Sequence, residues 1–348
     1  MKKKLYLLFG IFLAIIISSC GRTHQYPYKI SDFRPELRVQ LQKLVTENLL
    51  PSKDTAAINF LNKKCTKEEL LQILNCENPL LRIIAYRTIV NRKEKDYFKI
   101  LLNHLNDTAK VTWWYYNDAA DVFTISDLMI RKAADNRELT QNEKNILVDS
   151  ILIKHPYLHV STWMIQDIQP QEKYYTLIRE RAKIKTERCG EQLSACYALS
   201  KFKKNEDVKL LEDAFRKSNQ VCIVWIFRSI ENFPNDNFFP FLQNYYNTKV
   251  IGKLTSTNNV NDDLLYFCRA VASYKNDESL KILKYIENHN TYINKPYWPP
   301  SNKEYVFKAI YKHKSEKYDR LFNQLKPQID SLTLSVIDEP EYNEKAMW

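Results

Sequence analysis

The chain has 348 residues, of which 45% are hydrophobic and 27% charged, with a formal net charge of +11 at pH 7. This composition can bury a core and excludes an intrinsically disordered chain. Only 4 residues are glycine, where ordinary usage gives about 24. Because phosphate-cradling loops, Rossmann folds and tight hairpins rely on glycine, helices joined by polar corners are expected.

The first 19 residues have the pattern of a secretory signal: lysines at 2–4, then the apolar run LYLLFGIFLAIII. The run is shorter than the roughly 20 residues of a membrane span. The motif ISSC at 17–20 resembles the lipobox of bacterial lipoproteins. The resemblance implies a signal peptide over residues 1–19, lipidation of Cys20 and a tether over residues 20–31. An ordinary signal peptide and an uncleaved anchor are the alternatives.

The segment CGRTHQ has no acidic residue after the cysteine. In enteric-type sorting an Asp there retains a lipoprotein in the inner membrane, and in some other lineages an acidic stretch marks surface export. In a cell that has an outer membrane, the resemblance therefore implies an outer-membrane protein that faces the periplasm. Loss of residues 1–19 removes three lysines and leaves a net charge of +8. Anionic lipids, acidic glycans or acidic proteins suit an exported basic chain, and no nucleic acid partner is expected.

Six cysteines follow Cys20, and no pair of them has the CxxC spacing of a zinc site. Export permits disulfides, but the sequence does not specify a pairing. Two of the six fall at apolar helix positions and are expected to be buried thiols; these are Cys196 and Cys268. The others are Cys65, Cys76, Cys189 and Cys222.

Helical patterns begin at about residue 32. The segment RPELRVQLQKLVTENLL places Leu37, Leu41 and Leu44 on one face at the helical period. Capping boxes, in which a hydroxyl and a carboxylate three residues later satisfy the first backbone N–H groups, mark three further helix starts. They are Thr66 with Glu69, Thr140 with Glu143, and Ser301 with Glu304.

Residues 106–157 are expected to be a divergent repeat with an irregular entry loop, NDTAKVTWWYYND. Consecutive aromatic residues cannot all face one core, so one or two of them should reach solvent or a partner. They are Trp113, Trp114, Tyr115 and Tyr116. A second aromatic group occupies a proline-rich corner and contains Tyr292, Tyr297 and Trp298. Both groups are predicted as recognition surfaces; the alternative is that they fill junctions between repeats.

Five segments share an apolar helix end, a polar corner of four or five residues and a second amphipathic helix. The aligned apolar positions are Ile89, Leu199, Ile230, Val271 and Ile310 in the first helices, and Leu101, Leu211, Leu242, Leu283 and Phe322 in the second. Residues 78–105 and 158–328 resemble HEAT-type repeats. The resemblance implies an all-α fold, an α-solenoid of stacked helix hairpins forming a HEAT-like superhelix over residues 32–330, followed by a loose tail over residues 331–348.

No catalytic pattern accompanies these repeats. His155 and His159 have a metal-binding spacing, but Pro156 breaks the helix that would align them, and no HExxH motif is present. GxSxG and SxxK motifs are also missing. The sequence therefore predicts no catalytic residue, no metal and no cofactor.

The sequence predicts a membrane-anchored, non-catalytic helical scaffold that binds another envelope protein or peptide. A lipoprotein that binds a glycan or envelope polymer through exposed aromatic loops is the second hypothesis. An unrecognised enzyme is the third, because a scaffold does not determine a function.

Overall fold

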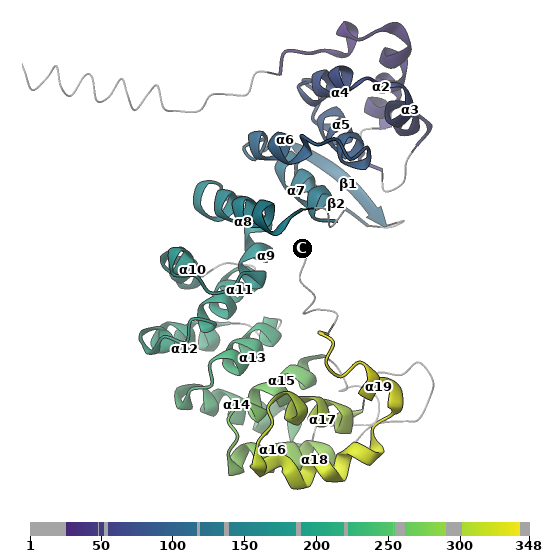
Figure 1. Ribbon diagram of the computed structural model, residues 1–348. Coiled ribbons are helices and arrows are strands. Elements are labelled where there is room, and N and C mark those ends of the chain that lie inside the picture. Colours follow the sequence, from purple (N-terminus) through teal and green to yellow (C-terminus); the bar gives the residue numbers. More distant parts are fainter. Residues whose placement is uncertain are drawn as a thin grey trace, which may run out of the picture. The chain divides into compact units, whose positions relative to one another are not determined.

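The computed structural model describes residues 26–47, 49–51, 55–116, 119–135, 139–185, 189–218, 222–252, 254, 262–289 and 301–341. The chain divides into two compact units, unit 1 up to Ser150 and unit 2 from Ile151. Apart from one β-hairpin, the regular elements of the described ranges are helices (Figure 1). The predicted all-α class is therefore confirmed. Among the helices of the described ranges, none combines the length and apolarity that a bilayer crossing requires.

Unit 1 is built around one buried helix. After the short helix η1 (Ile30–Asp32), its helices are α2 (Pro35–Glu47), α3 (Ala56–Lys64), α4 (Lys67–Leu74), α5 (Pro79–Asn91), α6 (Tyr97–Asn103), α7 (Ile125–Asp135) and α8 (Gln141–Asp149). Helix α5 contacts α2, α3, α4, α6 and α7, and most of its residues are buried. The Asn78 side chain caps this helix by accepting the backbone N–H of Leu80 at 2.9 Å.

The expected entry loop at residues 106–118 is in part a β-hairpin, which the sequence analysis did not predict. Strand β1 (Lys110–Tyr116) pairs antiparallel with β2 (Ala119–Thr124). Leu50 adds a further backbone pairing to β1, because its N–H donates to Thr112 O at 2.9 Å and its C=O accepts from Trp114 at 3.2 Å. The run of aromatic and β-branched residues favours strand conformation, and Leu50, distant in sequence, supports one edge.

The described chain begins with residues that the sequence analysis assigned to a tether. Glu77 N–H donates to Tyr28 O at 3.0 Å, and the guanidinium of Arg82 lies 3.7 Å from the ring centroid of Tyr26. Residues 26–31 are therefore packed against unit 1.

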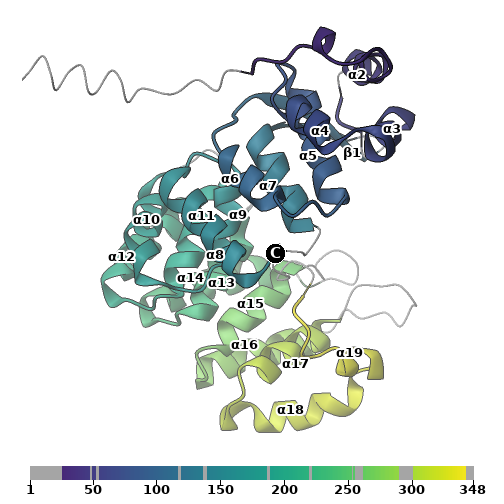
Figure 2. The same cartoon turned by 45° about the horizontal axis from the view of Figure 1, so that its top comes forward.

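Unit 2 contains a row of helices in which each contacts the next: α9 (Val160–Asp167), α11 (Cys189–Ser200), α13 (Ile223–Asn232), α15 (Asp262–Ala272) and α17 (Asn302–Lys312). Beside this row pack α10 (Glu172–Lys183), α12 (Val208–Lys217), α14 (Phe239–Tyr245), α16 (Asp277–Asn288) and α18 (Asp319–Leu325). Figures 1 and 2 show α10 and α12 on one side of α11 and α13. The short helix α19 (Ser331–Ser335) follows.

The aligned apolar positions of the first helices lie in the core. Ile89, Leu199, Ile230, Val271 and Ile310 are each 0–1% exposed. The corners repeat as well, because Lys93, Lys203 and Lys275 each lie four residues after an aligned apolar residue and have φ of 57°, 52° and 54°. This left-handed conformation ends a helix and usually belongs to glycine. Three of the five aligned corners thus share one backbone conformation, whereas Pro234 and Lys314 at the other two do not have positive φ.

Four cysteines are free and buried: Cys65, Cys76, Cys196 and Cys268. Burial raises the pKa of Cys196 to about 12, so this thiol stays protonated and packs as an apolar group. The expectation of buried thiols at Cys196 and Cys268 is confirmed. Cys222 is disulfide-bonded.

Candidate functional site

The aromatic residues predicted from sequence divide between described and undescribed parts of the chain. Trp113 is half-buried, with its ring 5.8 Å from that of Phe123 and 5.9 Å from the Arg131 guanidinium. Trp114 is 41% exposed. The side chains of Tyr115 and Tyr116 in β1 are not among those that the structure describes. The other predicted residues lie outside the described ranges: Cys20, Tyr292, Tyr297 and Trp298.

His155 and His159 do not lie on one continuous helix, because a turn at Pro156 and Tyr157 separates His155 from α9. His155 Nδ1 is 3.0 Å from the hydroxyl of Tyr157. Within the described ranges, no three His, Cys, Asp or Glu side chains are grouped closely enough to hold a metal ion.

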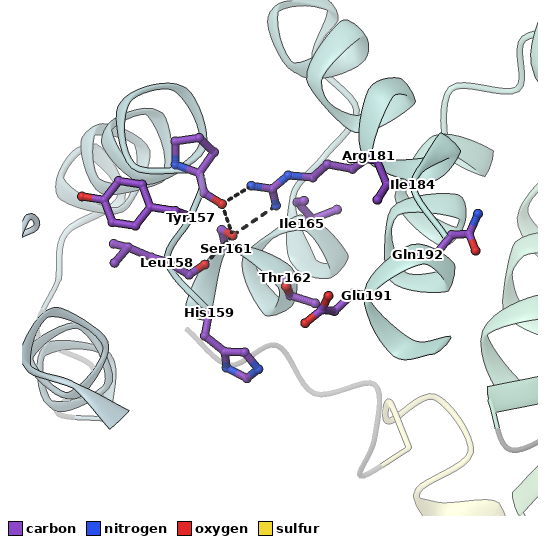
Figure 3. Close-up of a pocket in the computed structure, with 11 residues that line it drawn as sticks. Tyr157, Leu158, His159, Ser161, Thr162, Ile165, Arg181, Ile184, Glu191 and Gln192 are labelled. Atoms are coloured by element: carbon purple, nitrogen blue, oxygen red, sulfur yellow. Dashed lines mark hydrogen bonds between the residues drawn. The ribbon is translucent and has the colours of Figure 1, made fainter. Parts of the chain in front are cut away.

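A pocket of about 320 Å³ lies beside this turn, between α9, α10 and α11 (Figure 3). Arg181 points toward the turn and donates to Ser161 Oγ at 3.1 Å and to Pro156 O. The Ser161 hydroxyl is in turn within donating distance of the carbonyls of Leu158 and Pro156. We name this the Ser161 pocket.

The polar groups of the Ser161 pocket serve the fold. Burial lowers the pKa of Arg181, and the charge of Glu191 opposes that effect. The guanidinium donates hydrogen bonds to oxygen atoms of the 156–161 segment and so connects this segment to α10. Because the Ser161 hydroxyl donates to backbone carbonyls, its geometry is that of a structural serine rather than a nucleophile beside a general base.

Two of the other pockets in unit 2 share a lining residue, and together they form what we call the cationic face. The Arg228 pocket, of about 510 Å³, is lined by Gln169, Pro170, Tyr197, Lys201, Lys203, Arg228, Glu231, Asn232, Lys312 and His313. The Arg269 pocket, of about 670 Å³, is lined by Arg269, Lys275, Lys308, Tyr311, Lys312, Lys314 and residues 337–340. The two pockets share Lys312.

The central residues of the cationic face occupy one position of the repeat. Two residues before the aligned apolar position lie Tyr197 in α11, Arg228 in α13, Arg269 in α15 and Lys308 in α17. The Tyr266 ring links two of them, because the guanidinium groups of Arg228 and Arg269 lie 5.8 Å and 5.6 Å from its centroid. This polar column lies within the aligned segments, although the predicted repeats were defined by their apolar positions alone.

Arg228 is a buried cation that lacks a carboxylate partner in the described part of the chain. It is 9% exposed, lies over the rings of Tyr197 at 4.3 Å and Trp225 at 4.8 Å, and donates to the Tyr197 hydroxyl at 3.0 Å. Cation–π contacts offset only part of the cost of burying a charge. The Arg228 pocket therefore carries positive charge that no described carboxylate neutralises.

The other charged residues of the Arg228 pocket do not neutralise the positive charge of Arg228. Burial lowers the pKa of Lys201 to about 8, the charge of Arg228 adds to this effect and Asp167 opposes it. Glu231 already binds Lys312 Nζ at 2.9 Å and His313 Nε2 at 3.0 Å. Although burial raises the pKa of Glu231, the His313 hydrogen bond and the Lys312 charge lower it to about 2.

In the Arg269 pocket, the cations bind acidic residues of the C-terminal segment. Glu341 Oε1 lies 2.9 Å from Lys308 Nζ and 3.4 Å from Arg269 Nη2. The Tyr311 hydroxyl donates to Asp338 Oδ1 at 3.0 Å. Residues 337–341, part of the predicted loose tail, are therefore docked on unit 2. Charge complementarity between this segment and α15 and α17 supplies the reason.

No family model matches the chain, and neither a curated protein nor a solved structure matches it.

Proposed function

We propose that this protein is a lipid-anchored, non-catalytic scaffold of the bacterial cell envelope that holds a protein or peptide partner on the cationic face of unit 2. The observation that carries the proposal is the buried Arg228 guanidinium, which lines an open pocket and has no described carboxylate partner. Because no described carboxylate neutralises this cation, it can form a charge-assisted hydrogen bond with an anionic group of a partner.

The proposed anchor rests on the lipobox-like motif that ends at Cys20. The disulfide at Cys222 supports export, because disulfides persist in oxidising compartments. The absence of an acidic residue after Cys20 favours the outer membrane and its periplasmic face. Replacing Cys20 with Ser should release the protein from the membrane fraction and abolish incorporation of radiolabelled lipid. Continued lipid labelling of the variant would contradict the anchor.

A binding role agrees with the arrangement of the helices. Rows of stacked helix hairpins supply extended surfaces for partners, and α11, α13, α15 and α17 present cations and aromatic rings at equivalent positions. The Ser161 pocket, in contrast, holds its serine and arginine in hydrogen bonds to the backbone.

The scaffold proposal is tested by chemical crosslinking in intact cells, followed by purification of the protein from membranes. We expect one envelope protein to copurify with the unchanged chain and to be lost when Arg228 is replaced by Gln. Arg320→Gln is the matched control, since Arg320 lies exposed on α18. If no partner copurified under gentle crosslinking, the scaffold proposal would be abandoned.

Binding of an acidic glycan or envelope polymer is the second candidate, and the exposed Trp114 ring favours it because indole rings stack on sugars. Pull-down with cell-wall material should then depend on Trp114 and weaken when Trp114 is replaced by Ala. The half-buried Trp113 is the matched comparison, because its ring already packs against Phe123. If the cell-wall material retained the unchanged chain, Trp114→Ala and Trp113→Ala equally, this candidate would be removed.

A further inference from the structure

We infer that the Arg228 pocket is a subsite for a carboxylate side chain of an acidic, extended peptide segment in the partner protein. The inference rests on the proposed function and specifies the chemistry of the partner. Three observations carry it. The Arg228 guanidinium lines an open pocket and has no described carboxylate partner, the equivalent residues of the next two helices bind a carboxylate, and the segment that supplies this carboxylate is acidic.

The occupied equivalent is the pair Arg269 and Lys308. These residues hold the repeat position of Arg228 in the next two helices of the row, and they bind the carboxylate of Glu341 at 3.4 Å and 2.9 Å. Cations at this repeat position therefore bind a carboxylate elsewhere in the same unit. Charge-assisted hydrogen bonds of this kind are stronger and shorter than neutral ones.

The occupying segment indicates what kind of ligand fits. Residues 338–341 read Asp-Glu-Pro-Glu, and two of their carboxylates, from Asp338 and Glu341, reach Tyr311 and the Arg269–Lys308 pair. The proline favours an extended backbone in the residue before it. A partner segment with acidic residues at similar spacing would place a carboxylate at Arg228 by the same contacts.

The Arg228 pocket has the features that a carboxylate subsite requires. The guanidinium is held in place by the rings of Tyr197 and Trp225, so little conformational freedom is lost on binding. Exposed Lys203 and Lys312 line the same pocket and attract an approaching acidic segment. Glu231, the acidic residue among the lining residues, already contacts Lys312 and His313.

The test uses a fluorescent synthetic peptide with the sequence of residues 336–348, VIDEPEYNEKAMW, added to the full mature chain in detergent. Fluorescence anisotropy should show salt-sensitive binding. Replacing Arg228 with Gln should weaken it by about tenfold or more, because the charged donor is lost. Arg320→Gln should stay within about twofold, since it removes an equal charge elsewhere in unit 2.

Two more variants separate the pockets. Lys203→Gln, an exposed change in the Arg228 pocket, should weaken binding about two- to threefold, which keeps the test valid if Arg228→Gln fails to fold. Lys308→Gln should leave binding nearly unchanged, because the chain's own segment already fills the Arg269 pocket. If Lys308→Gln weakened binding and Arg228→Gln did not, the peptide would merely be exchanging with the C-terminal segment, and the inference would be overturned.

An oligogalacturonate probe distinguishes a glycan from a peptide. Arg228-dependent binding of this acidic sugar, with no binding of the peptide, would overturn the inference in favour of a glycan. The cell-based crosslinking described above is read separately. A captured partner that remains bound to Arg228→Gln would overturn the peptide subsite while leaving the scaffold standing.

Discussion

Two buried arginines, Arg82 in unit 1 and Arg228 in unit 2, show opposite ways of accommodating a charge inside a helical fold. The Arg82 side chain is 2% exposed and binds both oxygens of Asp107 at 2.8 Å and 3.0 Å. It also donates to the carbonyls of Cys76 and Glu77. Arg228 is 9% exposed, and its guanidinium donates to one described side chain, the Tyr197 hydroxyl.

The difference separates a structural arginine from a binding one. The Arg82 guanidinium is neutralised and connects α5 to the segment that precedes β1. The Arg228 guanidinium is held in position by aromatic rings, while its charge faces an open pocket. Burial alone therefore does not indicate the role of an arginine; the number of satisfied donors does.

The largest effect is expected at Arg82. Replacing it with Gln leaves Asp107 buried without its cation, and the free energy of unfolding should fall by about 3–5 kcal/mol. Chemical denaturation monitored by circular dichroism measures this change. Asp107→Asn should have an effect of similar size, because it leaves the guanidinium unpaired instead. A loss below about 1 kcal/mol would show that the pair behaves like a surface ion pair.

The next effect concerns Glu231 and pH. Its pKa of about 2 in the folded protein lies below the usual 4.5, so the stabilisation from its ionised form is complete above pH 4.5 and is lost as pH falls toward 2. The linked free energy is at most about 3 kcal/mol. Denaturation between pH 6 and 2 should show this loss, and Glu231→Gln should reduce the slope. Parallel slopes for both proteins would contradict the assignment.

Arg228 itself should matter little for stability, in contrast to Arg82. Replacing it with Met keeps an unbranched side chain over the rings and removes a buried charge, so the free energy of unfolding should change by less than about 1 kcal/mol, in either direction. The same denaturation experiment gives this value. A loss as large as that of Arg82→Gln would identify Arg228 as a structural residue.

A small stabilising effect is expected at the helix corners. Lys93 and Lys203 both have positive φ, and replacing either with Gly relieves a conformation that costs roughly 1 kcal/mol, so the thermal midpoint should rise slightly. Peptide affinity should distinguish the two variants, since Lys203 alone lines the Arg228 pocket. Equal affinities would argue against a contribution of Lys203 to binding.

Much of the fold could be predicted from the sequence because the decisive patterns are local. The capping boxes at Thr66, Thr140 and Ser301 begin helices as expected, and the aligned apolar residues are buried except for the half-buried Phe322. The β-hairpin could not be predicted in this way. Its edge depends on Leu50, some 60 residues from β1, and a long-range pairing of that kind leaves no periodic pattern.

The candidate site was missed for a related reason. The net charge of the chain is a sum over all residues and does not show that Arg228, Arg269 and Lys308 share one repeat position. The docking of Glu341 on α15 and α17 joins residues more than 30 positions apart. Among the predicted aromatic residues, Trp114 is exposed as expected for one or two of its cluster, but the described polar contacts single out the cationic face instead.

The most direct measurement is site-specific photocrosslinking in living cells, with a photoreactive amino acid in place of Gln169, an exposed residue that lines the Arg228 pocket. Mass spectrometry identifies the crosslinked segment of the partner. We predict a segment rich in Asp and Glu, and loss of the crosslink when Arg228→Gln is added but not when Arg320→Gln is added. A neutral or basic segment, or equal crosslinking in both double variants, would contradict the account.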